Sequence, residues 1–214
     1  MKSKIIRYLI FIAGLFLMGL GIALITKSNL GTSPISSIPY VLSMIFPVSF
    51  GQFTFLLSIL FLLLEILLLK GGVPKDQYLQ ILVGPFFGLF TDLGMRLFSF
   101  VKPDFYVAKL IVLLLGCIIL ALGVHLEIAA NVIVNPGEGV VKAIANKTGK
   151  DFGTVKIVFD SSLCFLAMTT SLFVFQTIKG LREGTLISAL LVGYITNIFS
   201  KAFRHLKVTE MANH

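Results

Sequence analysis

Long apolar runs alternate with short polar stretches along the whole chain. Five or six of these runs are long enough to form membrane-spanning helices, because about 20 apolar residues cross a bilayer core of about 30 Å. The runs cover approximately residues 5–26, 52–69, 78–100, 106–128, 155–178 and 184–204. Helices satisfy their own backbone hydrogen bonds in lipid, so the pattern predicts an all-α, polytopic membrane helix bundle.

Two further segments are too short to fit this pattern. Residues 33–46 contain Pro34 and Pro39, with Pro47 directly after them, and residues 135–148 read NPGEGVVKAIANKT. As a helix, each segment would be about 21 Å long, which is shorter than a bilayer core. We therefore expect eight helical segments, of which two are short half-helices held among the others.

An internal repeat appears when the chain is displaced by 102 residues. The matched residues are mostly glycine, proline and asparagine, and weak internal symmetry of this kind is typical of transporters. The matching pairs are Gly14–Gly116, Gly21–Gly123, Asn29–Asn131, Pro34–Pro136, Phe50–Phe152, Gly51–Gly153 and, after a three-residue insertion, Gly88–Gly193, Thr91–Thr196 and Asp92–Asn197. We predict two membrane repeats, residues 1–102 and 103–214, each with the order long, short, long, long, joined in one integrated domain.

Whether the short helices span or re-enter decides how the two halves are related. Spanning gives four crossings per half and parallel halves, whereas re-entry gives three crossings per half and inverted halves. Basic residues favour the cytoplasmic side, but eight crossings place about 13 of the 18 Lys and Arg inside and six crossings place about 12. Arg96, Lys102 and Lys109 lie inside only with eight crossings, so the sequence leans weakly to that arrangement.

Both short segments carry signals for a helix N-terminus. Asn135 is a preferred N-cap residue, proline follows it, and Glu138 completes a capping-box pattern. Ser33 is followed by proline and then by Ser36 in the same order. Two such helix tips pointing into the bundle would favour an anion, as half-helices do in secondary transporters. The alternative is that both segments are short spans with ordinary capped ends.

Several other polar residues lie in or beside apolar runs. Ionisable residues inside a membrane are costly and mark functional positions. Glu127, close to His125 and Asn131, could bind a proton or substrate, or it could simply reach the headgroups. Asp92 lies four residues before Arg96, a spacing that favours a local ion pair. The candidate residues for binding a solute or ion are Asn29, Ser33, Ser36, Asp92, Glu127, Asn131, Asn135, Glu138 and Asn197.

Two more carboxyl groups have simpler interpretations. Asp160 is four residues from Lys156, the spacing of a satisfied ion pair on one helix face. Glu65 lies near the end of its apolar run, close to Lys70, so we expect it at the membrane interface.

Composition and charge narrow the class of protein. The 214 residues are 57% apolar and 13% charged, with a mean hydropathy of +0.97, which is too apolar for a soluble domain of this size. The net charge is +8, but the basic residues stand singly or in small groups between apolar runs. They therefore indicate contact with anionic headgroups rather than nucleic acid. The first apolar run is too long for a signal peptide, so we expect an uncleaved helix with a cytoplasmic N-terminus.

Motifs for catalysis or for holding a cofactor are missing from the sequence. Cys117 and Cys164 lie inside apolar runs, without a second cysteine or a histidine at ligand spacing. No phosphate-binding loop, HExxH or GxSxG motif occurs. We therefore predict no enzyme activity, no cofactor and no metal site. The expected partners are the lipid bilayer and a small solute, and a homo-oligomer stays open.

Three blocks of the sequence resemble a known family. They are GIALITKSNLGTSP at residues 21–34, FGQ at 50–52 and GTLISALLVGYITN at 184–197. This combination is similar to the bacterial YczE/YyaS/YitT-like integral membrane family. Ser188 and Asn197 stand where that family has Asn and Asp. The resemblance implies a multi-pass protein of the bacterial plasma membrane, and it implies no particular substrate.

Two functions therefore stand side by side. The first is a small secondary transporter, a permease or exporter of a small solute, with anions among the candidates. The second is a non-transporting membrane scaffold or accessory subunit, in which the short helices are only structural. An intramembrane enzyme is disfavoured because the chain lacks a catalytic constellation.

Overall fold

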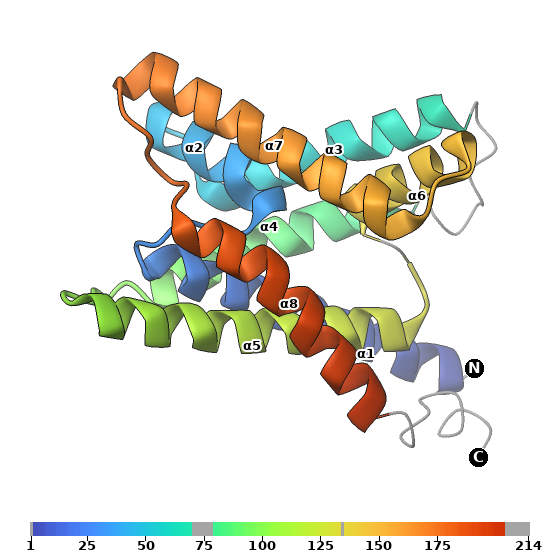
Figure 1. Ribbon diagram of the computed structural model, residues 1–214. Coiled ribbons are helices and arrows are strands. Elements are labelled where there is room, and N and C mark those ends of the chain that lie inside the picture. The colour runs from blue at the N-terminus through green and yellow to red at the C-terminus, as the bar shows by residue number, and fades with distance from the viewer. Residues whose placement is uncertain (1, 70–78, 134, 204–214) are drawn as a thin grey trace.

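The computed structural model describes residues 2–69, 79–133 and 135–203 (Figure 1). Within these ranges the chain forms eight α-helices and one 3-10 turn. They are α1 (Lys2–Lys27), η1 (Pro34–Ser36), α2 (Ser37–Ile45), α3 (Phe50–Leu68), α4 (Gln80–Leu97), α5 (Tyr106–Ala130), α6 (Pro136–Thr148), α7 (Phe152–Phe175) and α8 (Glu183–Ala202). This confirms the predicted all-α bundle with eight helical segments.

Five helices in the described part of the chain are long and apolar enough to cross a membrane: α1, α3, α5, α7 and α8. α4 has 18 residues, contains Pro85, and packs against both α1 and α3. η1 and α2 form one short apolar segment, and α6 has 13 residues. Both segments are short helices, as the sequence predicts.

The centre of the bundle is an antiparallel pair of helices, α1 and α5. Glycines let the two backbones approach closely, because a Cβ on Gly14 would lie 2.9 Å from the carbonyl oxygen of Gly123. A Cβ on Gly116 would lie 3.0 Å from the carbonyl oxygen of Gly21. At one end of the pair, the Arg7 guanidinium donates a hydrogen bond to the carbonyl at the end of α5. We call this end of the bundle the Arg7 end, and the opposite end the Lys27 end.

α4 runs parallel to α1. The α1 residue Gly19 lies against Thr91, and Ala23, one turn further on, lies against Gly94. Because the numbers of the contacting residues increase together along the two helices, the helices run in the same direction. α4 therefore ends at the Lys27 end, as α1 does.

The segment between α1 and α3 leaves and returns at one end of the bundle. Gly51, in the first turn of α3, meets Gly88 in the second half of α4, so α3 is antiparallel to α4. α1 thus ends, and α3 begins, at the Lys27 end. η1 and α2 lie between them as a re-entrant segment (Figure 1).

α6 is re-entrant from the opposite end. α5 finishes at the Arg7 end, and α6 then runs parallel to α3, because Gly137 lies against Phe61 and Gly139 lies against Glu65. α6 therefore returns to the Arg7 end. These helix directions do not fit eight crossings, towards which the sequence leaned. The counts of basic residues in the two schemes differed too little to decide between them.

α7 and α8 complete the second half. α7 packs on η1, α2 and α6, whereas α8 packs on α5. The Thr196 hydroxyl of α8 lies 3.4 Å from the carbonyl oxygen of Ala121, and Ser200 lies beside His125, so α8 runs parallel to α5. α7 and α8 diverge from each other in Figure 1 and form no packed pair.

Candidate functional site

The tips of the two re-entrant segments meet inside the bundle. Ile35 of η1 packs on Gly137 in the first turn of α6, where a Cβ would lie only 2.3 Å from the Ile35 Cδ1 atom. The glycine is what permits this contact. Ser33 at the N-cap of η1 and Asn135 at the N-cap of α6 are both buried. The contact between Ile35 and Gly137 thus joins two tips from distant parts of the chain, each of which carries a sequence-predicted site residue.

The two tips are capped differently. The Asn135 side-chain oxygen accepts a hydrogen bond from the Gly137 N–H at 3.2 Å, as an N-cap asparagine should. Glu138 closes no capping box with Asn135, so that part of the sequence prediction is wrong. The Ser33 hydroxyl donates to the Ser36 hydroxyl at 2.9 Å and caps no backbone N–H.

A group of charged side chains surrounds the tip of α6. The Lys156 ammonium lies 3.2 Å from the Asp160 carboxylate, which confirms the predicted ion pair on α7. Glu138 lies within electrostatic range of both residues. Glu127, only 5% exposed, lies within range of Glu138 and Lys156 and faces the backbone N–H of Asn135. We call Glu127, Glu138, Lys156 and Asp160 the charged cluster.

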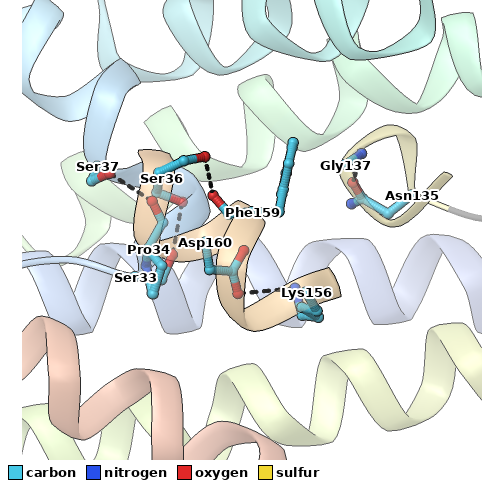
Figure 2. A network of polar contacts seen from close by, with 10 residues as sticks. Ser33, Pro34, Ser36, Ser37, Asn135, Gly137, Lys156, Phe159 and Asp160 are labelled. Atoms are coloured by element: carbon cyan, nitrogen blue, oxygen red, sulfur yellow. Dashed lines mark hydrogen bonds and ion pairs between the residues drawn. The ribbon is translucent and has the colours of Figure 1, made fainter. Parts of the chain in front are cut away.

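The charged cluster lies beside the meeting point of the tips. In the view of Figure 2, Asp160 and Lys156 stand between Ser33 and Asn135. One Asp160 oxygen is buried and has no hydrogen-bond partner among the described residues. Three carboxylates and one ammonium would carry a net charge of −2, which is costly in a low-dielectric interior. The arrangement can therefore accept protons, a cation or the donor groups of a substrate.

Two predicted site residues, Asn29 and Asn131, shape turns at opposite ends of the bundle. Both adopt a left-handed backbone conformation, with φ of 59° and 46°. Asparagine tolerates this conformation better than most residues. The Asn29 carbonyl accepts a hydrogen bond from Arg182, and the Asn131 carbonyl accepts one from Arg7. These residues direct the chain from a long helix into a re-entrant segment.

Asp92 fastens α4 to the start of α3. Its carboxylate accepts hydrogen bonds from the Ser49 hydroxyl and, at 2.7 Å, from the Gly51 N–H. The expected ion pair with Arg96 is wrong, because the open N–H groups of the α3 N-terminus take the carboxylate instead. Asn197, which the predicted repeat pairs with Asp92, is exposed on α8.

Glu65 is a buried carboxyl group in the last turn of α3. It is 5% exposed and lies among α3, α4 and α6, whereas its expected position at the membrane interface stays a prediction. Its carboxylate lies against Gly139, where a Cβ would come 2.3 Å from Oε2, and beside Gln80 and Lys142. Only the packing of α6 on α3 brings these residues together. In the sequence, Gly139 next to Lys142 is the feature that could have indicated a buried partner for α6.

Neither of two cavities at the Lys27 end is lined by the charged cluster. One, of about 440 Å³, lies between α3 and α4 beside Asp92, and the other, of about 410 Å³, is lined by basic residues. In the described part of the chain, no group of three or more His, Cys, Asp and Glu could hold a metal ion.

Together these features define a polytopic α-helical membrane protein with two re-entrant half-helices, whose exposed apolar side chains contact lipid. A family of unknown function, DUF6198, matches residues 5–201, and the chain belongs to this family. It is similar to the uncharacterized membrane protein YczE of Bacillus subtilis (strain 168), with 25% identity over 197 residues, 91% of this chain and 85% of the relative.

A second relative supports the same grouping. The uncharacterized protein YyaS of the same organism is 25% identical over 198 residues, 90% of this chain and 92% of the relative. The resemblance to the YczE and YyaS proteins is therefore confirmed. No solved structure matches the chain.

Proposed function

We propose that the protein is a small secondary transporter, a permease or exporter of a small solute. The observation that carries this proposal is the meeting of two half-helix tips beside the charged cluster. Helix N-termini that point into a bundle offer unpaired N–H groups to a solute. Discontinuous helices of this kind form the binding sites of many secondary transporters.

The proposal includes an inverted duplication of residues 1–102 and 103–214. An inverted duplication exchanges the two halves, so that each residue takes the place of its counterpart 102 positions away. Exchange sends Gly14 to Gly116 and Gly123 to Gly21, and Gly116 does contact Gly21. Because α1 and α5 are antiparallel, this exchange corresponds to an axis in the membrane plane.

A second set of contacts supports the same duplication. Gly19 on α1 lies against Thr91 on α4. The corresponding residues of the second half are Ala121 and Thr196, and they are joined by a hydrogen bond of 3.4 Å. The packing of α6 on α3 likewise corresponds to the packing of η1 and α2 on α7.

We propose six crossings, with the Arg7 end in the cytoplasm of a bacterial cell and the helices in its plasma membrane. This orientation places about 12 of the 18 Lys and Arg on the cytoplasmic side, as the positive-inside rule requires. α2 then re-enters from outside and α6 from the cytoplasm.

The charged cluster supplies a place for a coupling ion. Glu127 and Glu138 come from two different helices, α5 and α6, so a proton or cation shared by them would join these helices. The solute would bind next to them, at the N–H groups near Ser33 and Asn135. Solute and coupling ion would thus occupy adjacent positions at the junction of the two repeats.

The test is transport by the purified protein in liposomes, over a panel of small anions and metabolites. We expect a substrate-dependent flux that Glu138→Gln and Asn135→Ala each reduce at least about tenfold, the effect of losing about 1.4 kcal/mol. Asp104→Asn, an exposed carboxylate in the connection between α4 and α5, is the control and should retain the flux. Full transport by both site variants would contradict the proposed site.

A further inference from the structure

We propose that the basic cavity at the Lys27 end binds a small oxyanion, a phosphate or carboxylate group. This inference rests on the proposed function, because it makes the cavity the outer access site for an anionic substrate. The cavity has a volume of about 410 Å³. Three of its lining residues are basic, Lys109, Lys179 and Arg182, and none is acidic.

The basic residues come from separate parts of the fold. Lys109 belongs to the first turns of α5, whereas Lys179 and Arg182 belong to the connection between α7 and α8. Because the three residues come from different elements, only the fold brings their positive charges together around one cavity. Such convergence of like charges lowers stability unless a counter-charge binds.

The acidic residue next to the cavity does not neutralise it. Glu183 forms an ion pair with Arg182, at 3.2 Å, and lies within electrostatic range of Lys109. Three positive charges and one negative charge leave a net charge of +2. Arg182 also donates to the Asn29 carbonyl at 3.3 Å, so its guanidinium is held at the wall of the cavity. Lys179 lies over the Phe175 ring, with 4.6 Å between the ammonium and the ring centroid.

The walls of the cavity are held in shape by glycines with left-handed backbones. Gly31 has a φ of 117°, and a Cβ there would lie 2.3 Å from the Thr185 hydroxyl oxygen. Gly180 has a φ of 83°, and a Cβ there would lie 2.9 Å from Met44 and 3.1 Å from Tyr40. Conformations of this kind are confined largely to glycine, so the loops have one close-packed arrangement. A preorganised backbone lets the cavity bind an anion with little reordering of its loops.

The cavity is next to the first helix tip in the sequence. Gly31 lines the cavity, the Thr32 N–H donates a hydrogen bond to the Thr185 hydroxyl at 3.3 Å, and Ser33 is the next residue in the chain. Tyr40 of α2 lines the same cavity and adds a hydroxyl group. An anion held here would therefore lie beside the re-entrant segment that leads to the proposed binding site.

The test is binding of inorganic phosphate and of succinate to the full-length protein in detergent, measured by thermal unfolding at constant ionic strength. A second arm places the protein in nanodiscs of phosphatidylcholine alone or with added phosphatidylglycerol. We expect a saturable rise of the unfolding temperature with an oxyanion. Lys109→Gln and Lys179→Gln should each weaken this apparent binding about fivefold, as expected for one lost ion pair. Lys102→Gln, at the same end of the bundle but outside the cavity, is the charge-matched control.

The arms separate the outcomes. A response to phosphate or succinate that depends on Lys109 supports a soluble anion. The same dependence with phosphatidylglycerol alone supports the oxyanion site and identifies a lipid headgroup as its source. No response in either arm, or an equal loss in Lys102→Gln, overturns the proposal. Because binding is measured without flux, these results stand apart from the transport test of Glu138→Gln.

Discussion

α3 and α4 pack against each other, whereas α7 and α8 diverge (Figure 1). Gly51 of α3 meets Gly88 of α4 so closely that a Cβ on Gly88 would lie 2.3 Å from the Gly51 carbonyl oxygen. At Gly193 of α8, which the predicted repeat pairs with Gly88, a Cβ would meet nothing within 4 Å. One pair of helices is thus closed and the other is open.

The residues that fasten the closed pair explain the difference. Asp92 bonds the Ser49 hydroxyl and the Gly51 N–H, and this joins α4 to the start of α3 at the Lys27 end. Asn197 stands at the corresponding place on α8 but is exposed. Under the proposed function, the contact of Asp92 with the start of α3 is formed at the Lys27 end, and the corresponding contact of Asn197 with the start of α7 is broken at the Arg7 end. Exchange of these two arrangements would alternate access to the site between the halves.

The largest expected effect is that of a methyl group between α3 and α4. Gly88→Ala should lower the free energy of unfolding by about 2–3 kcal/mol, because the added Cβ collides with the α3 backbone. Gly193→Ala, the matched control, should change it by less than about 1 kcal/mol and stabilise the helix, because the position is open. Thermal unfolding in detergent measures both variants. Equal losses in the two would show that the halves are packed alike.

Removal of the charge at Asp92 should have the next largest effect. Asp92→Asn weakens a carboxylate that accepts two hydrogen bonds at a helix N-terminus, at a cost of about 1–2 kcal/mol. Hydrogen exchange should rise at the first turn of α3 and stay unchanged in α7. Arg96→Gln is the control, because Arg96 forms no ion pair with Asp92 in the described structure. If Arg96→Gln destabilised the protein as much as Asp92→Asn, this would indicate that Asp92 and Arg96 form the ion pair predicted from the sequence.

The smallest effect concerns the cap at the start of α7. The predicted repeat pairs Asp151 with Ser49, and hydrogen bonds from the Thr154 N–H and hydroxyl hold the pKa of the Asp151 carboxyl group below its ordinary value. A lowered pKa in the folded state contributes stability above the ordinary aspartate value, and this stability is lost as the pH falls through the folded pKa. The difference in unfolding temperature between wild type and Asp151→Asn should therefore shrink as the pH is lowered below about 4. A difference that is constant with pH would contradict this role.

Much of the helical pattern is predictable from sequence because the apolar runs and helix caps are local signals. The 135–148 segment is found as Pro136–Thr148, and the run at 52–69 is found as Phe50–Leu68. The direction of the re-entrant segments was not predictable, because two topologies differed by about one basic residue in their count. Helix packing, which the sequence does not encode locally, decides it.

The candidate site also contains a part that is predictable from local sequence and a part that depends on helix packing. Asn135 and Asp160 have local partners, in the first turn of α6 and one turn back on α7, and their roles follow from spacing. Asp92 and Glu65 find their partners on other helices, so spacing within one helix predicts the wrong neighbour for Asp92 and does not predict the burial of Glu65. The approach of Glu127 to Glu138 likewise depends on how the chain returns into the bundle after α5.

The most direct measurement is a cysteine cross-link between the two helix tips. In a Cys117→Ala, Cys164→Ala background, we expect Ile35→Cys and Gly137→Cys to form a disulfide under mild oxidation in membranes. The Ile35 Cγ1 atom lies 3.5 Å from the Cβ position of residue 137, within reach of a disulfide. Ile35→Cys with Gly149→Cys, at the far end of α6, should stay reduced. A linked control pair, or no link between 35 and 137, would contradict the meeting of the tips on which the proposed transport site depends.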